Sequence, residues 1–248
     1  MLVDTHCHIH EADYPLDRSE VIARAHAAGV AKMICVGTSE QSSRDAIDFA
    51  EKHEDIYATV GVHPHDTKDG YAEIAELAKQ KVVAIGEVGL DYYYNHSPRD
   101  IQIAALESQI QTALDNNLPI IFHVRDAFND FWPILDNFHG IRGELHSFTD
   151  TQANLNKGFE HGLYVGVNGI STFTKDPHQQ QLFAAIPLER LLLETDAPFL
   201  TPTPYRGTVN EPAFVSEVAK HHAAIRGISP EDVATATTAN ATLLFDLK

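Results

Sequence analysis

Short apolar runs alternate with helical stretches eight times along this chain, and the alternation limits the folds that it can adopt. Short apolar runs bounded by turn residues are typical of strands buried in a parallel sheet. We predict strands near residues 2–5, 32–36, 56–60, 82–85, 119–122, 142–145, 163–167 and 190–194. Helical periodicity marks segments between them, at 19–29, 44–53, 72–80, 99–117 and 151–162.

Signals for the ends of helices support this division. Gly29 and Gly162 fall where a helix is commonly closed by a glycine cap. Ser229 is followed by Pro230 and by two acids, a pattern typical of a helix that begins with a serine N-cap and a proline in its first turn. We therefore expect helices to end at these glycines and a further helix to begin after Ser229.

Strands that alternate with helices form a parallel sheet with helical crossovers. The chain has 248 residues, close to the roughly 250 residues of one complete (β/α)8 barrel. No glycine-rich dinucleotide loop follows the first strand, which argues against an open doubly wound sheet. We predict the α/β class, with residues 1–248 forming a single (β/α)8 barrel of the TIM type, regular or distorted.

The formal net charge of −17 limits the partners of this chain. Surfaces that hold long nucleic acids through many phosphates are basic, so an anionic substrate must be drawn in locally, as bound cations would do. Residues 1–10 lack a basic segment followed by an apolar run, and no run of about 18 apolar residues occurs. We expect a cytoplasmic protein without membrane contact, plausibly a monomer, in which Cys7 and Cys35 are reduced and buried.

Ligand-type side chains follow the predicted strands at their carboxyl ends, where barrel enzymes place their chemistry. In the segment DTHCH, period-two alternation points His6 and His8 to one side and Cys7 to the other. The same alternation points Glu194 and Asp196 into the barrel, with Asp196 nearer its mouth. The ends of the first, fourth, fifth, sixth and eighth strands thus predict six converging ligands: His6, His8, Glu87, His123, His146 and Asp196.

This ligand set predicts two divalent cations. Imidazole together with carboxylate suits zinc, manganese, iron or cobalt, and the carboxylate share leaves magnesium open, so the sequence does not choose among Mg, Mn and Zn. Six ligands exceed the need of one closed site but fit two cations about 3.5–4 Å apart with a bridging carboxylate. Glu87 is the best bridge, because its strand lies between the strand of His6 and His8 and those of His123 and His146.

Each of these residues alone has an ordinary structural explanation. A single His-x-His pair is weak evidence for a metal, and a lone strand-end histidine or glutamate is more often a hydrogen-bonded side chain. Five separate strand ends carrying such residues together are hard to attribute to accident. Histidines in predicted helices or outer loops are expected to be solvated: His26, His53, His96, His139, His161, His178, His221 and His222.

The order of motifs resembles the TatD family of metal-dependent deoxyribonucleases, within the amidohydrolase-like barrels. The matching segments span nearly the whole chain: DTHCH (4–8), GVHPH (61–65), GEVGLDYYY (86–94), PIIFHVR (119–125), HSFT (146–149), GVNGIST (166–172), LLLETDAPFLTP (191–202), RG (206–207), NEP (210–212) and NATLLF (240–245). This set is specific for the family, though not for its substrate. Related lactonases and dihydroorotases often bridge their metals with a carboxylated lysine on the fourth strand, whereas this chain has Glu87 there.

The resemblance implies a role for each ligand. It implies that His6, His8 and Asp196 bind one cation, that His123 and His146 bind the other, and that Glu87 bridges them. We predict Asp196 and Glu87 as the catalytic residues. The resemblance also implies that Asp196 orients or deprotonates the attacking water. A metal lowers the pKa of bound water toward about 7, which would supply hydroxide between the two cations at cellular pH.

The same resemblance suggests that His63 faces the reacting phosphate, although packing beside Pro64 is the ordinary alternative. Arg125 and Arg206 have forked donors that suit phosphate oxygens, but surface arginines often only pair with acids. Arg206 is the better candidate because it lies in the RG…NEP loop after the eighth strand. Tyr92, Tyr93 and Tyr94 either stack nucleobases or pack the loop after the fourth strand.

We expect a 3′-5′ exonuclease that acts on single-stranded or frayed DNA ends, with a role in DNA repair. The same site would equally serve an ester or amide hydrolase, such as a D-aminoacyl-tRNA deacylase or another small-molecule hydrolase, because bond choice depends on pocket shape. A non-catalytic binding protein is the third hypothesis. Lost ligands would be its sign, and all six ligand positions are intact.

Overall fold

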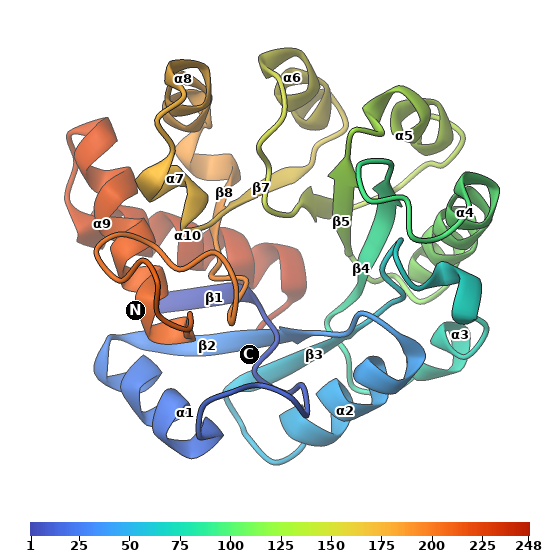
Figure 1. Ribbon diagram of the computed structural model, residues 1–248, viewed down its shortest axis with the longest axis horizontal. Coiled ribbons are helices and arrows are strands. Elements are labelled where there is room, and N and C mark those ends of the chain that lie inside the picture. The colour runs from blue at the N-terminus through green and yellow to red at the C-terminus, as the bar shows by residue number, and fades with distance from the viewer.

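Eight parallel strands form one sheet whose order follows the chain from β1 to β8 (Figure 1). The computed structural model describes residues 1–248. The strands are β1 (Leu2–Cys7), β2 (Val30–Val36), β3 (Ile56–Val60), β4 (Ala84–Asp91), β5 (Ile120–Arg125), β6 (Gly143–Leu145), β7 (Tyr164–Val167) and β8 (Leu191–Leu193). Helices surround the strands, as Figure 1 shows, so the predicted (β/α)8 barrel is confirmed.

The helices are α1 (Arg18–Ala27), α2 (Glu40–Ala50), α3 (Ile74–Leu77), α4 (Arg99–Asp115), α5 (Phe128–Leu135), α6 (Gln152–Glu160), α7 (Ile170–Phe173), α8 (Pro177–Ala185), α9 (Val215–Arg226) and α10 (Pro230–Phe245). Three short 3-10 turns are η1 (Thr67–Asp69), η2 (Leu188–Arg190) and η3 (Pro212–Phe214). The predicted helix ends are confirmed: Gly29 and Gly162 have positive φ after α1 and α6, and Ser229 forms a capping box with Asp232. None of the helices has the length and apolar character needed to cross a membrane.

Strand β4 differs most from its prediction, because it starts later and continues to Asp91. Its second half pairs with β5, from Val88 opposite Phe122 to Asp91 opposite Arg125. This pairing requires Gly89, since a Cβ there would lie 1.8 Å from the His123 carbonyl oxygen. Helix α3 is also shorter than the predicted segment 72–80. Local apolar periodicity does not reveal the extension of β4, because contact with a neighbouring strand stabilises it.

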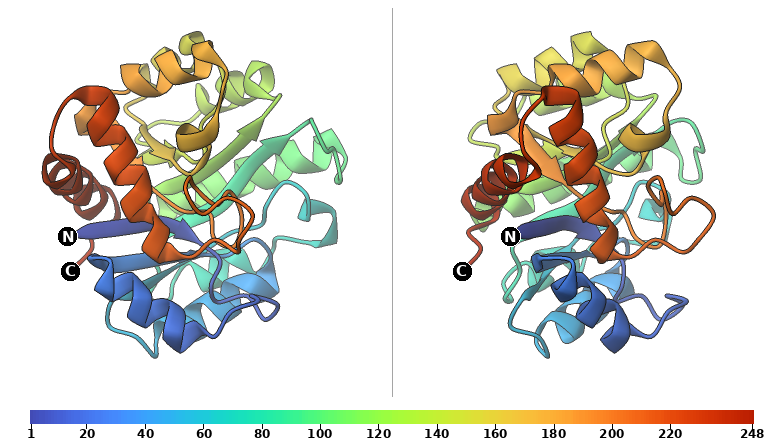
Figure 2. Two further views of the ribbon diagram at one scale, coloured as in Figure 1. Left: turned by 60° about the vertical axis from the view of Figure 1, so that its left-hand side comes forward. Right: turned by 90° about the vertical axis from the view of Figure 1, so that its left-hand side faces the viewer.

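The core has two parts. A cluster of 51 buried residues links the strands to the surrounding helices. A second cluster of 10 residues joins strand side chains such as Val3 and Ile121 to Leu244 and Phe245 of α10. Helix α10 lies against β1 and β8, near the end of the molecule where both chain termini emerge (Figure 2). Side chains of α10 fill that end of the barrel, so a site is expected at the opposite end, where the strands have their carboxyl ends.

Closure between β1 and β8 depends largely on side chains, because β8 is only three residues long. The buried Asp4 carboxylate accepts hydrogen bonds from the Thr195 backbone N–H at 2.8 Å and from its hydroxyl at 2.6 Å. Thr5 donates its hydroxyl to the Leu193 carbonyl at 3.1 Å. A single backbone bridge, between Cys7 and Ala197, continues the contact beyond the strand. These contacts hold the first and last ligand-bearing segments together.

Candidate metal centre

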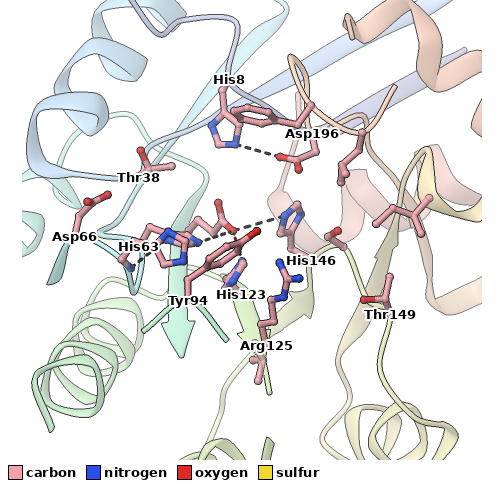
Figure 3. A pocket seen from close by; sticks show the side chains of 17 residues that line it. His8, Thr38, His63, Asp66, Tyr94, His123, Arg125, His146, Thr149 and Asp196 are labelled. Carbon is pink, nitrogen blue, oxygen red and sulfur yellow. Dashed lines mark hydrogen bonds and ion pairs between the residues drawn. The ribbon is translucent and has the colours of Figure 1, made fainter. Parts of the chain in front are cut away.

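The six predicted ligands meet at the carboxyl ends of the strands. They come from β1 and the residues directly after it, from β4 and β5, and from the segments that follow β6 and β8. A cavity of 710 Å³ opens above them, and all of the six except the fully buried His6 line it. Figure 3 shows His8, Asp196, His123 and His146 directed into this cavity. The fold thus brings together residues that lie up to 190 positions apart, His6 and Asp196.

One half of the centre is formed by His6, His8 and Asp196. The Nε2 atoms of the two histidines lie 3.1 Å apart. Asp196 Oδ1 lies 3.3 Å from His8 Nε2 and 3.8 Å from His6 Nε2. The His8 Nδ1 atom contacts the Val36 carbonyl at 2.9 Å, so Nδ1 donates and Nε2 is left as a lone-pair donor to a ligand.

Glu87 lies between this half and a second group of histidines. Its Oε2 is 3.5 Å from His6 Nε2, while its Oε1 is 2.8 Å from His123 Nδ1. His146 Nε2 and His63 Nε2 are each 3.6 Å from the same Oε1. The two carboxylate oxygens therefore face different histidines, which is the arrangement a bridging ligand needs.

The donor atoms fit divalent cations. Three overlapping groups have ligand atoms within 4.8 Å of one another: His6, His8, Glu87; His6, His146, Asp196; and His63, Glu87, His123. Imidazole nitrogens and carboxylate oxygens are ligands that transition metals and magnesium accept. We expected His63 at the reacting phosphate, but its donor atom is also close enough to those of Glu87 and His123 to share a cation with them. The residues present thus fit the metal chemistry that the sequence predicts.

The carboxylates of the centre stabilise positive charge. Burial opposes ionisation of Glu87, but the charges of His63 and His146 and the hydrogen bonds of His123 and His6 hold its pKa well below the usual range. Burial likewise opposes ionisation of Asp196, yet the hydrogen bond from His8 lowers its pKa. Burial lowers the pKa of His6 and of His63. At His8, His123 and His146 the neighbouring carboxylates outweigh burial and raise the pKa, that of His146 to about 10. A cation binds the neutral imidazole, so at His146 it would displace a proton.

Two acids that we did not predict as site residues orient the histidines. Asp91 accepts from His123 Nε2 at 3.1 Å and from His65 Nε2 at 3.0 Å. Glu194, fully buried, accepts from His146 Nδ1 at 3.0 Å. Such second partners fix the ring orientation and basicity of ligating histidines. The spacing of Asp91 from Glu87, four residues along one strand, was a signal that both point to the same face.

Asp196 reaches the cavity for a reason other than the predicted one. Strand β8 ends at Leu193, before either acid, and Asp196 has a left-handed backbone with φ of 59°. Its backbone N–H donates to the His6 carbonyl at 2.8 Å, which ties the segment to β1. Its side chain is 15% exposed, whereas Glu194 is completely buried. A turn after the strand, rather than strand alternation, separates the two carboxylates.

The predicted substrate residues divide into two groups. His63 and Arg125 line the cavity, and the Arg125 guanidinium lies 4.0 Å from the centre of the Tyr93 ring. Arg206 does not line it: its guanidinium donates to the Thr201 carbonyl at 2.6 Å and lies 3.8 Å from the centre of the Phe173 ring. The structure therefore favours Arg125 over Arg206 as the cation beside the centre.

Two histidines outside the centre are buried: His222, which we predicted to be solvated, and His10, for which we made no prediction. His222 is fully buried and contacts the Ser171 hydroxyl at 3.1 Å, so the prediction that it is solvated was wrong. It lies on the inner face of α9, four residues after Val218, where packing decides its environment. His10, which continues the alternate spacing of His6 and His8, is buried and contacts Ser42 at 3.2 Å.

Comparisons with known proteins agree over the whole chain. The model of a family described as TatD related DNase matches residues 3–246. The uncharacterized metal-dependent hydrolase YabD of Bacillus subtilis is 40% identical, covering 99% of both chains. The 3′-5′ ssDNA/RNA exonuclease TatD of Citrobacter rodentium is 36% identical, covering 99% of this chain and 98% of its own. The crystal structure of YJJV, a TatD homologue from Escherichia coli, matches with a TM-score of 0.91 at 27% identity, covering 100% of this chain and 98% of that one.

Proposed function

The chain belongs to the family of TatD-related DNases and is a metal-dependent hydrolase, and from this premise we propose that it removes nucleotides from the 3′ end of single-stranded DNA. One observation carries the proposal: Glu87 lies between two groups of imidazoles at the floor of a cavity that Arg125 borders. That arrangement places metal ligands and a cation for phosphate in one cavity. The relative from Citrobacter rodentium, named as an exonuclease, supports the choice of substrate.

We assign His6, His8 and Asp196 to one cation, His123 and His146 to the other, and Glu87 to both. His63 lies as close to Glu87 as His146 does, so it is a further ligand or a contact to the phosphate. When bound, the two cations act as Lewis acids toward the phosphate and lower the pKa of bound water. The native metal, whether Mg, Mn or Zn, stays open.

The residues of the chain divide the remaining work. Asp196 is ionised and lines the cavity, so its carboxylate is placed to take the proton of the attacking water. Asp91 and Glu194 hold His123 and His146 in fixed orientations. Arg125, stacked on Tyr93 and Tyr94, presents its N–H donors at the rim, where they suit a phosphate oxygen. For Arg206, contact with the phosphate stays a prediction.

An ester or amide hydrolase, such as a D-aminoacyl-tRNA deacylase, remains the alternative for the same centre. One experiment separates the candidates: a metal-loaded preparation is given linear single-stranded DNA, a covalently closed circle of the same sequence, a mischarged tRNA and a panel of lactones. We expect turnover of the linear strand alone. Equal degradation of the circle would replace the exonuclease by an endonuclease, and turnover of the tRNA or a lactone without DNA cleavage would contradict the nuclease.

The metal assignment has its own test. Elemental analysis after loading should find two divalent cations per chain, and a single saturable site would contradict the assignment. Glu87→Ala should lose more bound metal and more activity than His8→Ala or His123→Ala, because Glu87 faces both groups of histidines.

A further inference from the structure

A second cavity, of 740 Å³, adjoins the cavity of the metal centre. The two share His8, Thr38 and Phe199 in their walls. The loop after β1, the start of α2 and the turn after Asp196 form the rest of the second cavity. Figure 3 shows His8 and Arg125 on opposite sides of the first cavity, so the second cavity adjoins the side away from Arg125. A substrate that crosses the centre can therefore occupy both.

The charges of the two cavities differ. The first has Arg125 at its rim and histidines on its floor, and of its three carboxylates, Asp66, Glu87 and Asp196, the last two are assigned to the cations. The second is lined by the carboxylates of Glu11, Asp13 and Asp45, with no lysine or arginine. A polyanionic strand is therefore attracted on the Arg125 side and repelled on the other. The part of a nucleic acid that fits the second cavity is a part without a phosphate.

One of the three carboxylates of the second cavity, that of Glu11, is held in place by two neighbours. Ser42 donates its hydroxyl to Glu11 Oε1, and His10 Nε2 lies 3.4 Å from the same oxygen. Burial opposes ionisation, but these two partners lower the pKa of Glu11 to about 2. The carboxylate is thus charged at pH 7 and oriented, and Oε2 is not used by either contact. Such a group accepts a hydrogen bond from a neutral hydroxyl and repels an anion.

Phe199 offers an aromatic face at the boundary. It lines both cavities and is 61% exposed, so its ring is accessible to a ligand in either cavity. Nucleobases stack on such rings without sequence preference. We call the side of the second cavity formed by Glu11, Asp13 and Asp45 the acidic wall. A base on Phe199 would place its sugar near both the centre and this acidic wall.

We propose that the second cavity binds the terminal nucleoside of the strand, with the base on Phe199 and the free 3′ hydroxyl facing the carboxylates. The assignment rests on the proposed nuclease function. The scissile phosphate then lies at the centre, and the upstream phosphates lie on the Arg125 side. A 3′ phosphate, which is an acceptor with a charge of about −1.5 to −2, would meet the acidic wall and be excluded. The wall therefore selects strands that end in a hydroxyl.

The test compares two single-stranded oligonucleotides that differ only in ending with a 3′ hydroxyl or a 3′ phosphate, each labelled at the 5′ end. We expect the metal-loaded protein to shorten the hydroxyl-ended strand at least tenfold faster. Equal rates would contradict the subsite while leaving the nuclease intact. Cleavage of neither strand, with turnover of an ester, would contradict the proposed function itself and the subsite with it.

The acidic wall is tested by Asp13→Asn combined with Asp45→Asn. The preference for the hydroxyl end should fall about fivefold, mainly because the phosphate-ended strand reacts faster. Asp115→Asn combined with Glu107→Gln is the matched control on α4. Asp115 accepts a hydrogen bond from Gln111 as Asp45 accepts one from Gln41, and neither Asp115 nor Glu107 lines the cavity of the metal centre or the second cavity. An unchanged preference in the first variant, or an equal fall in the control, would overturn the assignment.

The stacking role is tested with a strand whose last nucleotide lacks its base. The wild type should bind the base-bearing end about tenfold better, seen as a lower KM with similar kcat. Phe199→Ala should abolish the difference between the two strands, and Phe199→Tyr should restore it. If Phe199→Ala slows both strands equally, the ring serves only the local structure and the nucleoside subsite is wrong.

Discussion

At the scale of residues, the acids behind the histidines are the most informative. Asp91 and Glu194 do not take part in the three ligand groups, yet each accepts a hydrogen bond from one histidine of the centre. Fixing an imidazole before the metal arrives reduces the entropy lost on binding. These acids should therefore affect cation affinity more than the chemical step.

Asp91→Asn provides the first prediction. The substitution keeps an acceptor oxygen but removes the charge that holds His123 and His65. Cation affinity should fall about 10- to 100-fold, measured by metal titration with thermal melting of the same sample. Asp130→Asn is the control, because Asp130 accepts only from the exposed Tyr92 hydroxyl. Unchanged affinity in Asp91→Asn would show that the contact is incidental.

Asp196→Asn separates chemistry from metal retention. If Asp196 takes the proton of the attacking water, single-turnover cleavage should fall about 100-fold or more, with the fold and the cation at His123 and His146 retained. Glu194→Gln is the variant to compare with Asp196→Asn. Its affinity for cations should fall, but its cleavage rate should return to that of the wild type at saturating metal. Near-normal cleavage by Asp196→Asn at full metal occupancy would transfer the catalytic role to another carboxylate.

At the scale of elements, the junction of β1 and β8 is the weak point of the barrel. Thr195→Val removes a donor to the buried Asp4 carboxylate and leaves an unpaired polar atom in the core. The free energy of unfolding should fall by about 1 to 3 kcal/mol, measured by chemical denaturation. Thr235→Val, at an exposed threonine of α10 that donates to the Glu231 carbonyl, should change stability much less. Equal effects would mean that the junction does not depend on Thr195.

At the scale of the whole molecule, the centre should contribute to thermal stability. A cation at 100 times its Kd stabilises the folded state by about 2.7 kcal/mol. For a domain of this size that corresponds to a Tm higher by roughly 5 to 10 °C. A chelator should lower the Tm of the wild type by this amount and leave that of Glu87→Ala unchanged. The same fall in both would indicate cations bound elsewhere.

The net charge of −17 leads to a prediction about salt. Few phosphates are neutralised by side chains of the protein, with Arg125 as the arginine beside the centre. The slope of log affinity against log salt for single-stranded DNA should be shallow, about −1, because each neutralised phosphate contributes about −0.7. Arg125→Ala should bring it near zero at constant metal. A slope steeper than about −3 would reveal a basic surface that the composition does not suggest.

Local sequence patterns are enough to predict the barrel and the set of candidate ligands. Apolar runs alternate with helical stretches over the whole chain, and this periodicity depends on residues close in sequence. Parallel strands also have their carboxyl ends on one side, so His6, Glu87 and His123 had to approach one another. The family motifs then pointed to the same residues.

The partners of those residues depend on contacts between segments that are far apart in the chain. The contacts of Asp91 with His65, of Glu11 with Ser42 and of Arg206 with Thr201 were not evident from local patterns. The first two depend on the stagger of neighbouring strands and on where a helix begins, and the third on the shape of a loop. The second cavity likewise exists only because segments 11–15, 38–45 and 198–199 meet in space. Local periodicity determines on which face of a strand or helix a residue lies. Which residues from other elements it contacts there depends on the packing of the whole barrel.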